Sequence, residues 1–516
     1  MLARVCSAAV LGLQAYPVDV EVDVGMGLPA FAIVGLPDAA VQEAKERVRA
    51  AIRNSNYEVP ARRITINLAP ADVRKAGPGF DLPMAIGILA ATRQIRAPTP
   101  SGTMMVGELS LDGGLRPVTG LLSILLSARS RGARAIIVPE PNAGEAALVE
   151  GMQIYPAATL MQVIGHLEGT SPITPLRIAR TATAFPPDDA DFADVRGQHH
   201  AKRAMEIAAA GGHNVLLVGP PGAGKTMLAR RLPTILPPLT WDEVLEVTQV
   251  YSVAGLLHGS GPVVARPFRS PHHTSSTAAL IGGGPGPRPG EVTLAHRGVL
   301  FLDELPEFHR DVLEVLRQPL EDRVVTVARV QSTVAFPAAF MLVAAMNPCA
   351  CGHYGDTTLA CVCTPPQVTR YLARISGPLL DRIDLHVDVP RVAASDLTTQ
   401  PVGEPSARIC ERILAARGRQ ERRFGKAGAC NAAMTVRQIR RACALGESAM
   451  RFLAETMERL GFSARAFDRT LCLARTIADL EGCHAIADGH LAEAMQYRPF
   501  DRTWRGSVAG RLDTPC

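Results

Sequence analysis

The chain is poor in aromatic residues, which make up 4% of its 516 residues, and it has only 2 tryptophans. Proteins that hold single-stranded nucleic acid by base stacking interleave aromatic with basic side chains, and the sequence shows no such stripe. It also lacks an excess of charge of one sign, because 54 basic residues nearly balance 49 acidic ones. The formal net charge of +5 neither requires nor excludes a nucleic-acid partner, so any basic surface must be local.

Long apolar runs are absent too, and no run approaches the ~20 residues that a membrane-spanning helix requires. The first 20 residues contain one arginine and a short apolar run that leads directly into strand-like alternation, which disfavours a signal peptide. The 11 cysteines are odd in number and mostly isolated, as in a reducing compartment. We therefore expect a soluble cytoplasmic protein with no membrane partner.

The length predicts two to four domains. Residues 18–24 alternate with period two, as a half-buried strand does, and residues 39–54 have the pattern of an amphipathic helix. With further strands expected at 64–68 and 135–138 and a helix at 83–91, the first unit should be a compact α+β domain. The predicted order is an N-terminal domain at 1–170, a linker at 171–192, a nucleotide-binding core at 193–394, a linker at 395–406 and a helical unit at 407–505.

The most informative segment is residues 214–226, NVLLVGPPGAGKT, in which a buried strand runs into a glycine-rich loop. Glycines at this spacing let backbone N–H groups surround a phosphate, while a lysine reaches the β- and γ-phosphates and a hydroxyl holds Mg²⁺. The helix expected to follow adds its positive N-terminal end. The segment predicts a nucleoside triphosphate site formed by Gly219, Pro220, Pro221, Gly222, Ala223, Gly224, Lys225 and Thr226.

Hydrolysis needs a metal anchor and a base, and a second apolar strand ends in the two carboxylates Asp303 and Glu304. Asp303 would hold the Mg²⁺ shell together with Thr226, and Glu304 would polarise the attacking water. A third strand, at 340–345, is followed by Asn347, whose amide could position that water or mark an ordinary strand-end turn.

Two arginines are further candidates. Arg382 could neutralise transition-state charge across a subunit boundary, although the sequence does not distinguish this role from a surface salt bridge. Arg465 begins an amphipathic helix and could reach back to the nucleotide or remain a solvated helix residue.

Four cysteines form two C-x-C pairs, Cys349 with Cys351 and Cys361 with Cys363, and His353 lies between the pairs. Four converging thiolates could hold a tetrahedral structural Zn²⁺. The spacing departs from the commoner C-x-x-C knuckle, so unpaired buried cysteines and redox chemistry stay open as alternatives.

Together these motifs resemble the magnesium-chelatase-like YifB/ComM family of AAA+ ATPases over essentially the whole chain. The most specific segments are RPFRSPHHT at 266–274, PGEVTLAH at 289–296, residues 298–308 and residues 345–352. The resemblance implies an α/β P-loop core with a helical C-terminal lid, assembled as a homo-hexamer with ATP sites between protomers. It implies that Lys225 and Thr226 are Walker A, Asp303 and Glu304 Walker B, Asn347 sensor 1, Arg382 the arginine finger and Arg465 sensor 2, with Arg374 as a weaker candidate for the finger.

The same family includes DNA branch-migration helicases of natural transformation. Residues 324–348 also resemble the pre-sensor hairpin of minichromosome-maintenance helicases, in which a basic residue meets DNA in the pore. Arg329 matches that position, although a structural hairpin with an incidental arginine remains open. Residues 268–290 resemble the helix-2 insert that faces the pore, which makes His272 and His273 candidates for DNA contact. A metal site at these adjacent histidines is disfavoured, because neighbouring residues rarely share a ligand face.

Residues 1–170 resemble the proteolytic domain of Lon, which uses a serine–lysine dyad. This chain has Gly79 at the serine position and Leu122 at the lysine position. Neither can replace the catalytic group, so we expect a non-proteolytic domain used for interaction or DNA contact. The sequence predicts an ATP-driven DNA translocase, with a protein-remodelling motor of the chelatase type as the alternative and an ATP-dependent protease disfavoured.

Overall fold

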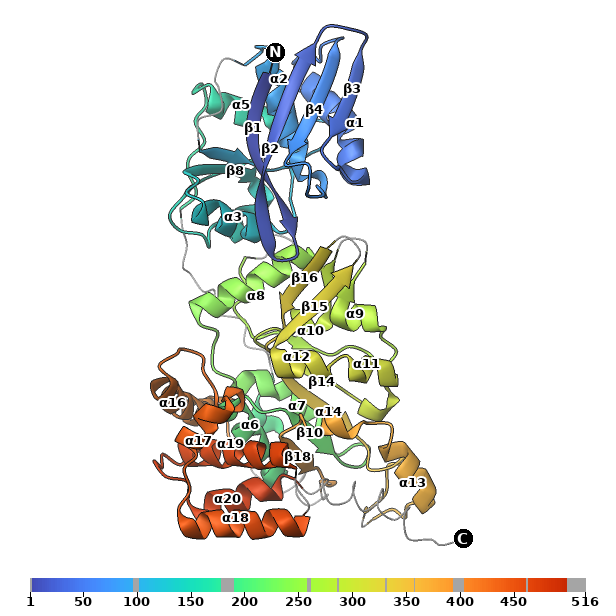
Figure 1. Ribbon diagram of the computed structural model, residues 1–516, viewed down its shortest axis with the longest axis vertical. Coiled ribbons are helices and arrows are strands. Elements are labelled where there is room, and N and C mark those ends of the chain that lie inside the picture. The colour runs from blue at the N-terminus through green and yellow to red at the C-terminus, as the bar shows by residue number, and fades with distance from the viewer. Residues whose placement is uncertain are drawn as a thin grey trace.

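The computed structural model describes residues 2–95, 102–177, 190–257, 261–284, 287–329, 332–356, 358–392, 403–460 and 463–498. Parts of the two predicted linkers, at 171–192 and 395–406, lie outside the described residues. Figure 1 shows an N-terminal α/β unit in blue to cyan, a central α/β unit in green to yellow and a helical C-terminal unit in orange to red. The predicted mixed α/β class with C-terminal helices is confirmed.

The N-terminal unit is built on a seven-stranded sheet in the order β3-β4-β2-β1-β5-β8-β9. Its strands are β1 (Leu2–Leu11), β2 (Gln14–Gly25), β3 (Ala30–Val34), β4 (Arg63–Ala69), β5 (Thr103–Met105), β8 (Ala135–Pro139) and β9 (Gln153–Ala157). The helices are α1 (Ala39–Asn54), α2 (Asp81–Ala91), α3 (Leu121–Ser130), α4 (Ala143–Ala146) and α5 (Leu160–Leu167), and β6 (Glu108–Leu109) pairs with β7 (Leu115–Arg116). The period-two pattern predicted β2 correctly, because its alternate valines are buried. Helix α1 begins where the Asp38 side chain accepts a hydrogen bond from the Val41 amide.

The central unit contains a five-stranded sheet whose strands all run parallel, in the order β11-β14-β17-β10-β18. The strands are β11 (Phe268–Arg269), β14 (Val299–Leu302), β17 (Met341–Met346), β10 (Val215–Val218) and β18 (Leu385–Asp388). Strands β10, β14 and β17 are buried along their whole length, as expected for a parallel sheet covered on both faces. Because the strands are parallel, their carboxyl ends meet at one edge of the sheet, which is where ligands bind in such folds.

Successive residues of β10 face opposite sides of this sheet. Val215 and Leu217 join one apolar core, which is shared with the C-terminal helices, whereas Leu216 and Val218 join a second core on the other face. The helices of the unit are α6 (His199–Gly211), α7 (Lys225–Ile235), α8 (Trp241–Ala254), α9 (Thr277–Ile281), α10 (Glu291–Leu294), α11 (Arg310–Glu314), α12 (Arg317–Asp322), α13 (Pro365–Leu372) and α14 (Gly377–Leu380).

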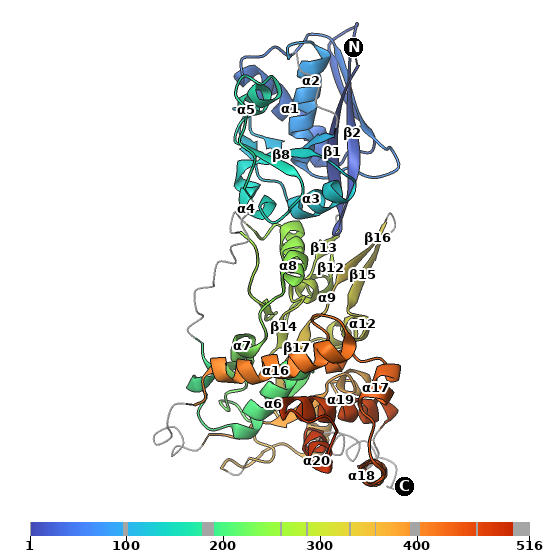
Figure 2. The same cartoon turned by 90° about the vertical axis from the view of Figure 1, so that its left-hand side faces the viewer.

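Two hairpins extend from the central unit. In the larger one, β15 (Val324–Arg329) pairs antiparallel with β16 (Ser332–Pro337), as the sequence predicted, and Arg329 is opposite Ser332. In the smaller one, β12 (Gly282–Gly283) pairs with β13 (Arg288–Pro289) within the predicted insert. Figure 2 shows the larger hairpin rising from the central unit toward the N-terminal unit.

The C-terminal helices are α16 (Ser406–Phe424), α17 (Val436–Ala442), α18 (Glu447–Leu460), α19 (Ala464–Leu480) and α20 (Asp488–Gln496). Figure 2 shows α16 and α19 lying against α6, so this unit continues the core of the central one. Among the described helices, none combines the length and apolarity needed to cross a bilayer.

The N-terminal unit contacts the central unit mainly through α3 and α8. The side chain of Gln249 on α8 donates hydrogen bonds to the Leu13 carbonyl at 2.8 Å and to the Ser123 hydroxyl at 3.0 Å. The Ser252 hydroxyl donates to the Glu145 carboxylate of the N-terminal unit. At the β1–β2 turn, Gly12 has a φ of +62° and lies so close to β16 that a Cβ atom on it would be 2.2 Å from Val334 Cγ1.

Candidate functional site

The predicted phosphate loop lies at the carboxyl edge of the central sheet, between β10 and α7. Gly222 and Gly224 have φ values of +78° and +91°, a region of backbone conformation that favours glycine. At Gly219 the constraint is contact, because a Cβ there would lie 2.1 Å from the Val389 carbonyl oxygen. Helix α7 begins at Lys225, so its N-terminal N–H groups face the loop.

Lys225 is buried, and its ammonium group is held inside the loop. Its Nζ donates to the carbonyl oxygens of Gly219 at 2.6 Å and Pro220 at 2.9 Å, and to Asn347 Oδ1 at 3.1 Å. Burial lowers the pKa of this lysine, although the nearby Asp303 and Glu304 act in the opposite direction. The ammonium is thus positioned to exchange carbonyl partners for phosphate oxygens.

The predicted Mg²⁺ ligands meet between α7 and the end of β14. Thr226 Oγ1 donates to Asp303 Oδ2 at 2.8 Å, which brings together a hydroxyl and a carboxylate of the kind that hard divalent cations prefer. These oxygens fit Mg²⁺ because they converge beside the phosphate loop, where the ion can also meet phosphate oxygens. Asn347, at the end of β17, contacts the same loop through Lys225.

Glu304 is more than half exposed and has a φ of +53°, a strained backbone conformation for a residue with a side chain. Its Oε2 lies 3.6 Å from His273 Nδ1. The His273 ring also lies 4.1 Å from that of His272 and meets the edge of Phe308. The contact between His273 and the carboxylate of the predicted base was missed by the sequence analysis, since two turn residues about thirty positions apart carry no local signal.

The two arginine candidates, Arg382 and Arg465, both bind the side chain of Glu321. Arg382 is buried and donates to the Pro378 carbonyl at 2.6 Å and to the Glu321 carboxylate. Arg465 donates to the other oxygen of Glu321 at 3.3 Å. The structure therefore joins Arg382 and Arg465 at the end of α12, and the contact that it gives Arg465 is with Glu321 rather than with the phosphate loop. No motif in the sequence pointed to Glu321.

The weaker finger candidate, Arg374, occupies a third position. Its guanidinium pairs with Glu307 Oε1 at 2.8 Å and lies over the ring of Tyr371. Glu307 follows Glu304 by three residues, so Arg374 is tied to the turn after β14.

The four cysteines come together directly after β17. The Sγ atoms of Cys349, Cys351 and Cys361 are 3.3 to 3.7 Å apart, and with Cys363 all four lie within 4.8 Å of one another. The His353 Nδ1 faces Asp356 at 3.5 Å, and among the described residues no histidine joins the four sulfur atoms.

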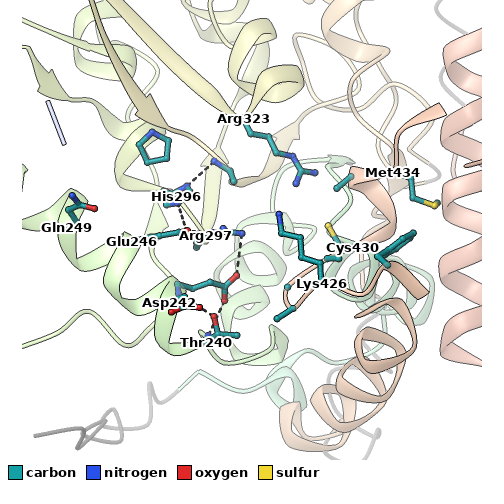
Figure 3. A pocket seen from close by; sticks show the side chains of 18 of the residues that line it. Thr240, Asp242, Glu246, Gln249, His296, Arg297, Arg323, Lys426, Cys430 and Met434 are labelled. Carbon is teal, nitrogen blue, oxygen red and sulfur yellow. Dashed lines mark hydrogen bonds and ion pairs between the residues drawn. The ribbon is translucent and has the colours of Figure 1, made fainter. Parts of the chain in front are cut away.

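A separate cavity of about 830 Å³ lies between α8, the base of the hairpin and the loop after α16, and no phosphate-loop residue is among its described lining residues. Figure 3 shows Glu246 on one side between His296 and Arg297, with Lys426 and Cys430 opposite. The Glu246 carboxylate accepts from His296 at 3.2 Å and from Arg297 at 2.8 Å. The hydrogen bond with His296, reinforced by Arg297, lowers the pKa of Glu246 to about 2.

Comparisons with known proteins agree with this geometry. The chain is 46% identical to a protein named YifB from Salmonella typhimurium over 97% of this chain and 98% of that protein. It is also 46% identical to competence protein ComM from Haemophilus influenzae, with the same coverage. The chain belongs to the YifB/ComM family.

Family models describe all three units of this YifB/ComM family member in similar terms. Residues 191–397 match the model described as magnesium chelatase, subunit ChlI. Residues 20–142 match subunit ChlI of Mg-chelatase, and residues 403–498 match the C-terminal part of that subunit. The chain is thus a magnesium-chelatase-like protein of the AAA+ class, which supports an ATPase-type activity.

The N-terminal unit of this family member also shows the Lon likeness. It is 30% identical to Lon protease 2 from Bacillus subtilis over 143 residues, which cover 26% of this chain and 25% of that protein. At the predicted dyad positions, Gly79 has no side chain, and Leu122 is fully buried in α3 within an apolar core. The Leu122 side chain therefore has a packing role, and the backbone amide of the same residue donates to buried Glu145 at 2.7 Å.

Proposed function

We propose that this protein is an ATP-hydrolysing motor that works as a homo-hexameric ring in the cytoplasm and moves along single-stranded or branched DNA, promoting branch migration during recombination or transformation. The DNA part depends on one observation above all. The β15–β16 hairpin is followed, after three residues, by β17, the strand that ends next to Asn347. A movement of Asn347 when its phosphate contacts change can therefore be transmitted to the hairpin through β17 alone.

The arrangement of the arginines supports the ring. Arg382 and Arg465 meet on Glu321, only three residues before β15 begins. In a ring, the proposed role of Arg382 is to contact the ATP of the neighbouring protomer, whereas Arg465 is proposed to reach back to the nucleotide as sensor 2. If Arg382 left Glu321 to bind a phosphate of the neighbouring protomer's ATP, the conformation at the base of the same hairpin would change. The similarity to a protein named as a competence protein points in the same direction.

The proposal assigns roles within the nucleotide site. Lys225 and the loop amides bind the triphosphate, Thr226 and Asp303 hold Mg²⁺, Glu304 orients the water and Asn347 positions the γ-phosphate. Mg²⁺ supplies charge neutralisation on the phosphates when it is bound. A structural Zn²⁺ ion in the four-cysteine cluster completes the cofactors. None of the described cysteines forms a disulfide bond, which supports a reducing cytoplasm.

The decisive experiment measures ATP turnover of the full chain at low salt with and without forked or single-stranded DNA. We expect stimulation by DNA that weakens as salt is raised, because backbone contacts release counterions. Glu304→Gln should retain ATP binding and lose turnover. If DNA neither binds nor stimulates hydrolysis, the translocase proposal fails.

Arg329, the last residue of β15, tests the hairpin. Arg329→Ala should lower DNA-stimulated turnover and leave the basal rate unchanged, whereas Arg370→Ala, a change at an exposed position of α13, should do neither. Full stimulation of the Arg329 variant would remove the hairpin from the proposal without removing the ATPase. His272 and His273 remain DNA-contact candidates at the start of the insert.

The second candidate function is a protein-remodelling motor without a nucleic-acid substrate. The observation in its favour is that all three family models are those of a magnesium chelatase subunit. It predicts ATP turnover that responds to a partner protein and not to DNA. The N-terminal unit serves interaction in either case, and the loss of both dyad groups predicts no peptidase activity.

A further inference from the structure

The four-cysteine cluster has the dimensions of a zinc site. A Zn–S bond of about 2.3 Å in a tetrahedral site places neighbouring sulfur atoms about 3.8 Å apart. Three of the sulfur pairs lie 3.3 to 3.7 Å apart, and the four atoms are mutually within 4.8 Å. These separations exceed a disulfide bond of about 2.05 Å. The sulfur atoms surround a common centre and are not paired.

The cluster is packed against the nucleotide site. Cys349 is fully buried in the same apolar core as Val218 and Met346, which end β10 and β17. Directly after Cys351, the Gly352 amide donates to the Cys349 carbonyl at 3.0 Å, which closes a tight turn.

That turn is in contact with the phosphate loop. Gly352 has a φ of +85°, and a Cβ atom on it would lie 2.6 Å from Cδ of Pro221 and 4.0 Å from Cγ of Asn347. The backbone of the cysteine turn therefore lies directly on the proline ring in the middle of the loop. Nothing larger than glycine fits between them without displacing one or the other.

The second cysteine pair connects the cluster to the other side of the site. Cys363 is followed by Thr364, the N-cap of α13, and this helix leads to Arg374. Arg374 pairs with Glu307, three residues after the proposed catalytic base. A metal at the cluster thus joins the strand that carries Asn347 to a helix tied to the Walker B turn.

We infer that Cys349, Cys351, Cys361 and Cys363 bind one Zn²⁺ ion, and that this ion holds the phosphate loop in its ATP-binding shape through the contact between Gly352 and Pro221. Zinc occupancy then controls nucleotide affinity. Loss of the metal by chelation therefore weakens ATP binding. The inference rests on the ATP-binding part of the proposed function and is independent of DNA.

The site itself is tested by metal analysis. Purified full-length protein should contain about one zinc per chain, and Co²⁺ exchanged into it should give the visible absorption of tetrahedral thiolate coordination. Cys363→Ser should lose the metal, and Cys6→Ser, at an exposed cysteine outside the cluster, should retain it. Protein that contains no zinc and takes up neither Zn²⁺ nor Co²⁺ would overturn the site.

The coupling to the phosphate loop is tested by nucleotide affinity, measured with a fluorescent ATP analogue and no DNA. Chelation of wild-type protein should weaken binding at least about tenfold, since small displacements of a binding group are costly, and added Zn²⁺ should restore it. Gly352→Ala should keep zinc but weaken ATP binding, whereas Gly355→Ala, at a positive-φ glycine in the same loop with open space around it, should keep both.

These experiments distinguish three claims: the zinc site, its coupling to the phosphate loop and ATP binding itself. Zinc that can be removed with no change in ATP affinity would leave the site in place and overturn the coupling. Zinc-loaded wild-type protein that does not bind ATP at all would instead contradict the proposed function. If Cys363→Ser loses its fold by circular dichroism, the reversible chelation of wild-type protein and the Gly352→Ala variant still decide the coupling.

Discussion

At the scale of single residues, the nucleotide site depends on a few polar atoms aimed into the phosphate loop. Lys225 Nζ has three hydrogen-bond partners there, two backbone carbonyls and Asn347 Oδ1. All three can be replaced by phosphate oxygens, which bind an ammonium group more strongly because the bond is charge-assisted.

Lys225→Ala should therefore lower ATP affinity by about two orders of magnitude, which is equivalent to about 2.7 kcal/mol. Isothermal titration calorimetry would measure the change. Lys45→Ala, at an exposed lysine of α1, is the matched control and should bind ATP like the wild type. A Lys225 variant with normal affinity would mean that the triphosphate binds elsewhere.

The contact between His273 and Glu304 leads to a second prediction. A carboxylate held by an imidazole is less free to turn toward water, so His273→Ala should raise DNA-independent ATP turnover by about two- to tenfold, a small part of the roughly 10²–10⁴-fold that general acid–base catalysis contributes. His309→Ala, at an exposed histidine, should not change it. A lower rate in the His273 variant would show instead that this histidine supports the base.

The residues of this site differ in how far the sequence revealed them. Lys225, Thr226 and Asp303 lie in contiguous motifs whose spacing dictates their geometry, and the structure brings the three of them together. Glu321 was not predictable, because its partners Arg382 and Arg465 lie 61 and 144 positions away and only the fold brings them together. For the four cysteines, the sequence offered convergence on one site as one of several interpretations, and the structure shows their Sγ atoms within 4.8 Å of one another.

At the scale of elements, the phosphate loop is fitted closely between its neighbours. Gly219→Ala would force a methyl group against the Val389 carbonyl, which follows β18. We expect a loss of about 1–3 kcal/mol in the free energy of unfolding, typical of overpacking, together with weaker ATP binding. Gly418→Ala, within α16 and with open space around it, should instead add about 0.5–1 kcal/mol. Chemical denaturation of the two variants would measure both values.

Strand β18 is anchored by a fully buried carboxylate. Asp384 pairs with Arg469 at 2.9 Å and accepts from the Asn214 amide at 3.0 Å. Burial acts to raise the pKa of Asp384, but Arg469, His213 and the amide outweigh it and hold the pKa below its usual range.

Because this pKa is lower in the folded than in the unfolded chain, the contribution of Asp384 to stability is fully present above the ordinary aspartate pKa of about 3.9 and is lost as pH falls below it. Arg469→Met should remove the arginine partner of this buried carboxylate and cost about 3–5 kcal/mol at pH 7. The cost should shrink at acid pH, where the carboxyl group can be protonated. A cost that does not vary with pH in denaturation experiments would contradict this account.

The elements themselves were largely predictable. The strands that became β10 and β14 are short apolar runs next to motif residues, and the alternation in β2 indicated a strand with one buried face. The strand order of the central sheet was not predictable from periodicity, because β10 lies between β17 and β18, which are more than a hundred residues away.

At the scale of the whole molecule, the N-terminal unit and the central unit share a polar contact. Gln249 donates two hydrogen bonds across it, to Leu13 and Ser123. Gln249→Leu should lower the stability of this contact by about 1–2 kcal/mol, since both acceptors lose their donor. Calorimetry should show the N-terminal unit melting earlier, whereas Gln42→Leu, on the exposed side of α1, should melt as the wild type does. An unchanged melting transition of the Gln249→Leu variant would show that apolar contacts alone hold the two units together.

The larger hairpin also sets a length scale for the proposed motor. Its strand from Val324 to Arg329 has six residues, and at about 3.3 Å per residue the arm is about 20 Å long. A lever of that length needs a tilt of only about 10° at its base to move its end by about 3.4 Å, which equals the rise of one base pair along DNA. In the proposed translocase, a rotation of that size at the base of the hairpin would therefore correspond to a step of one base pair.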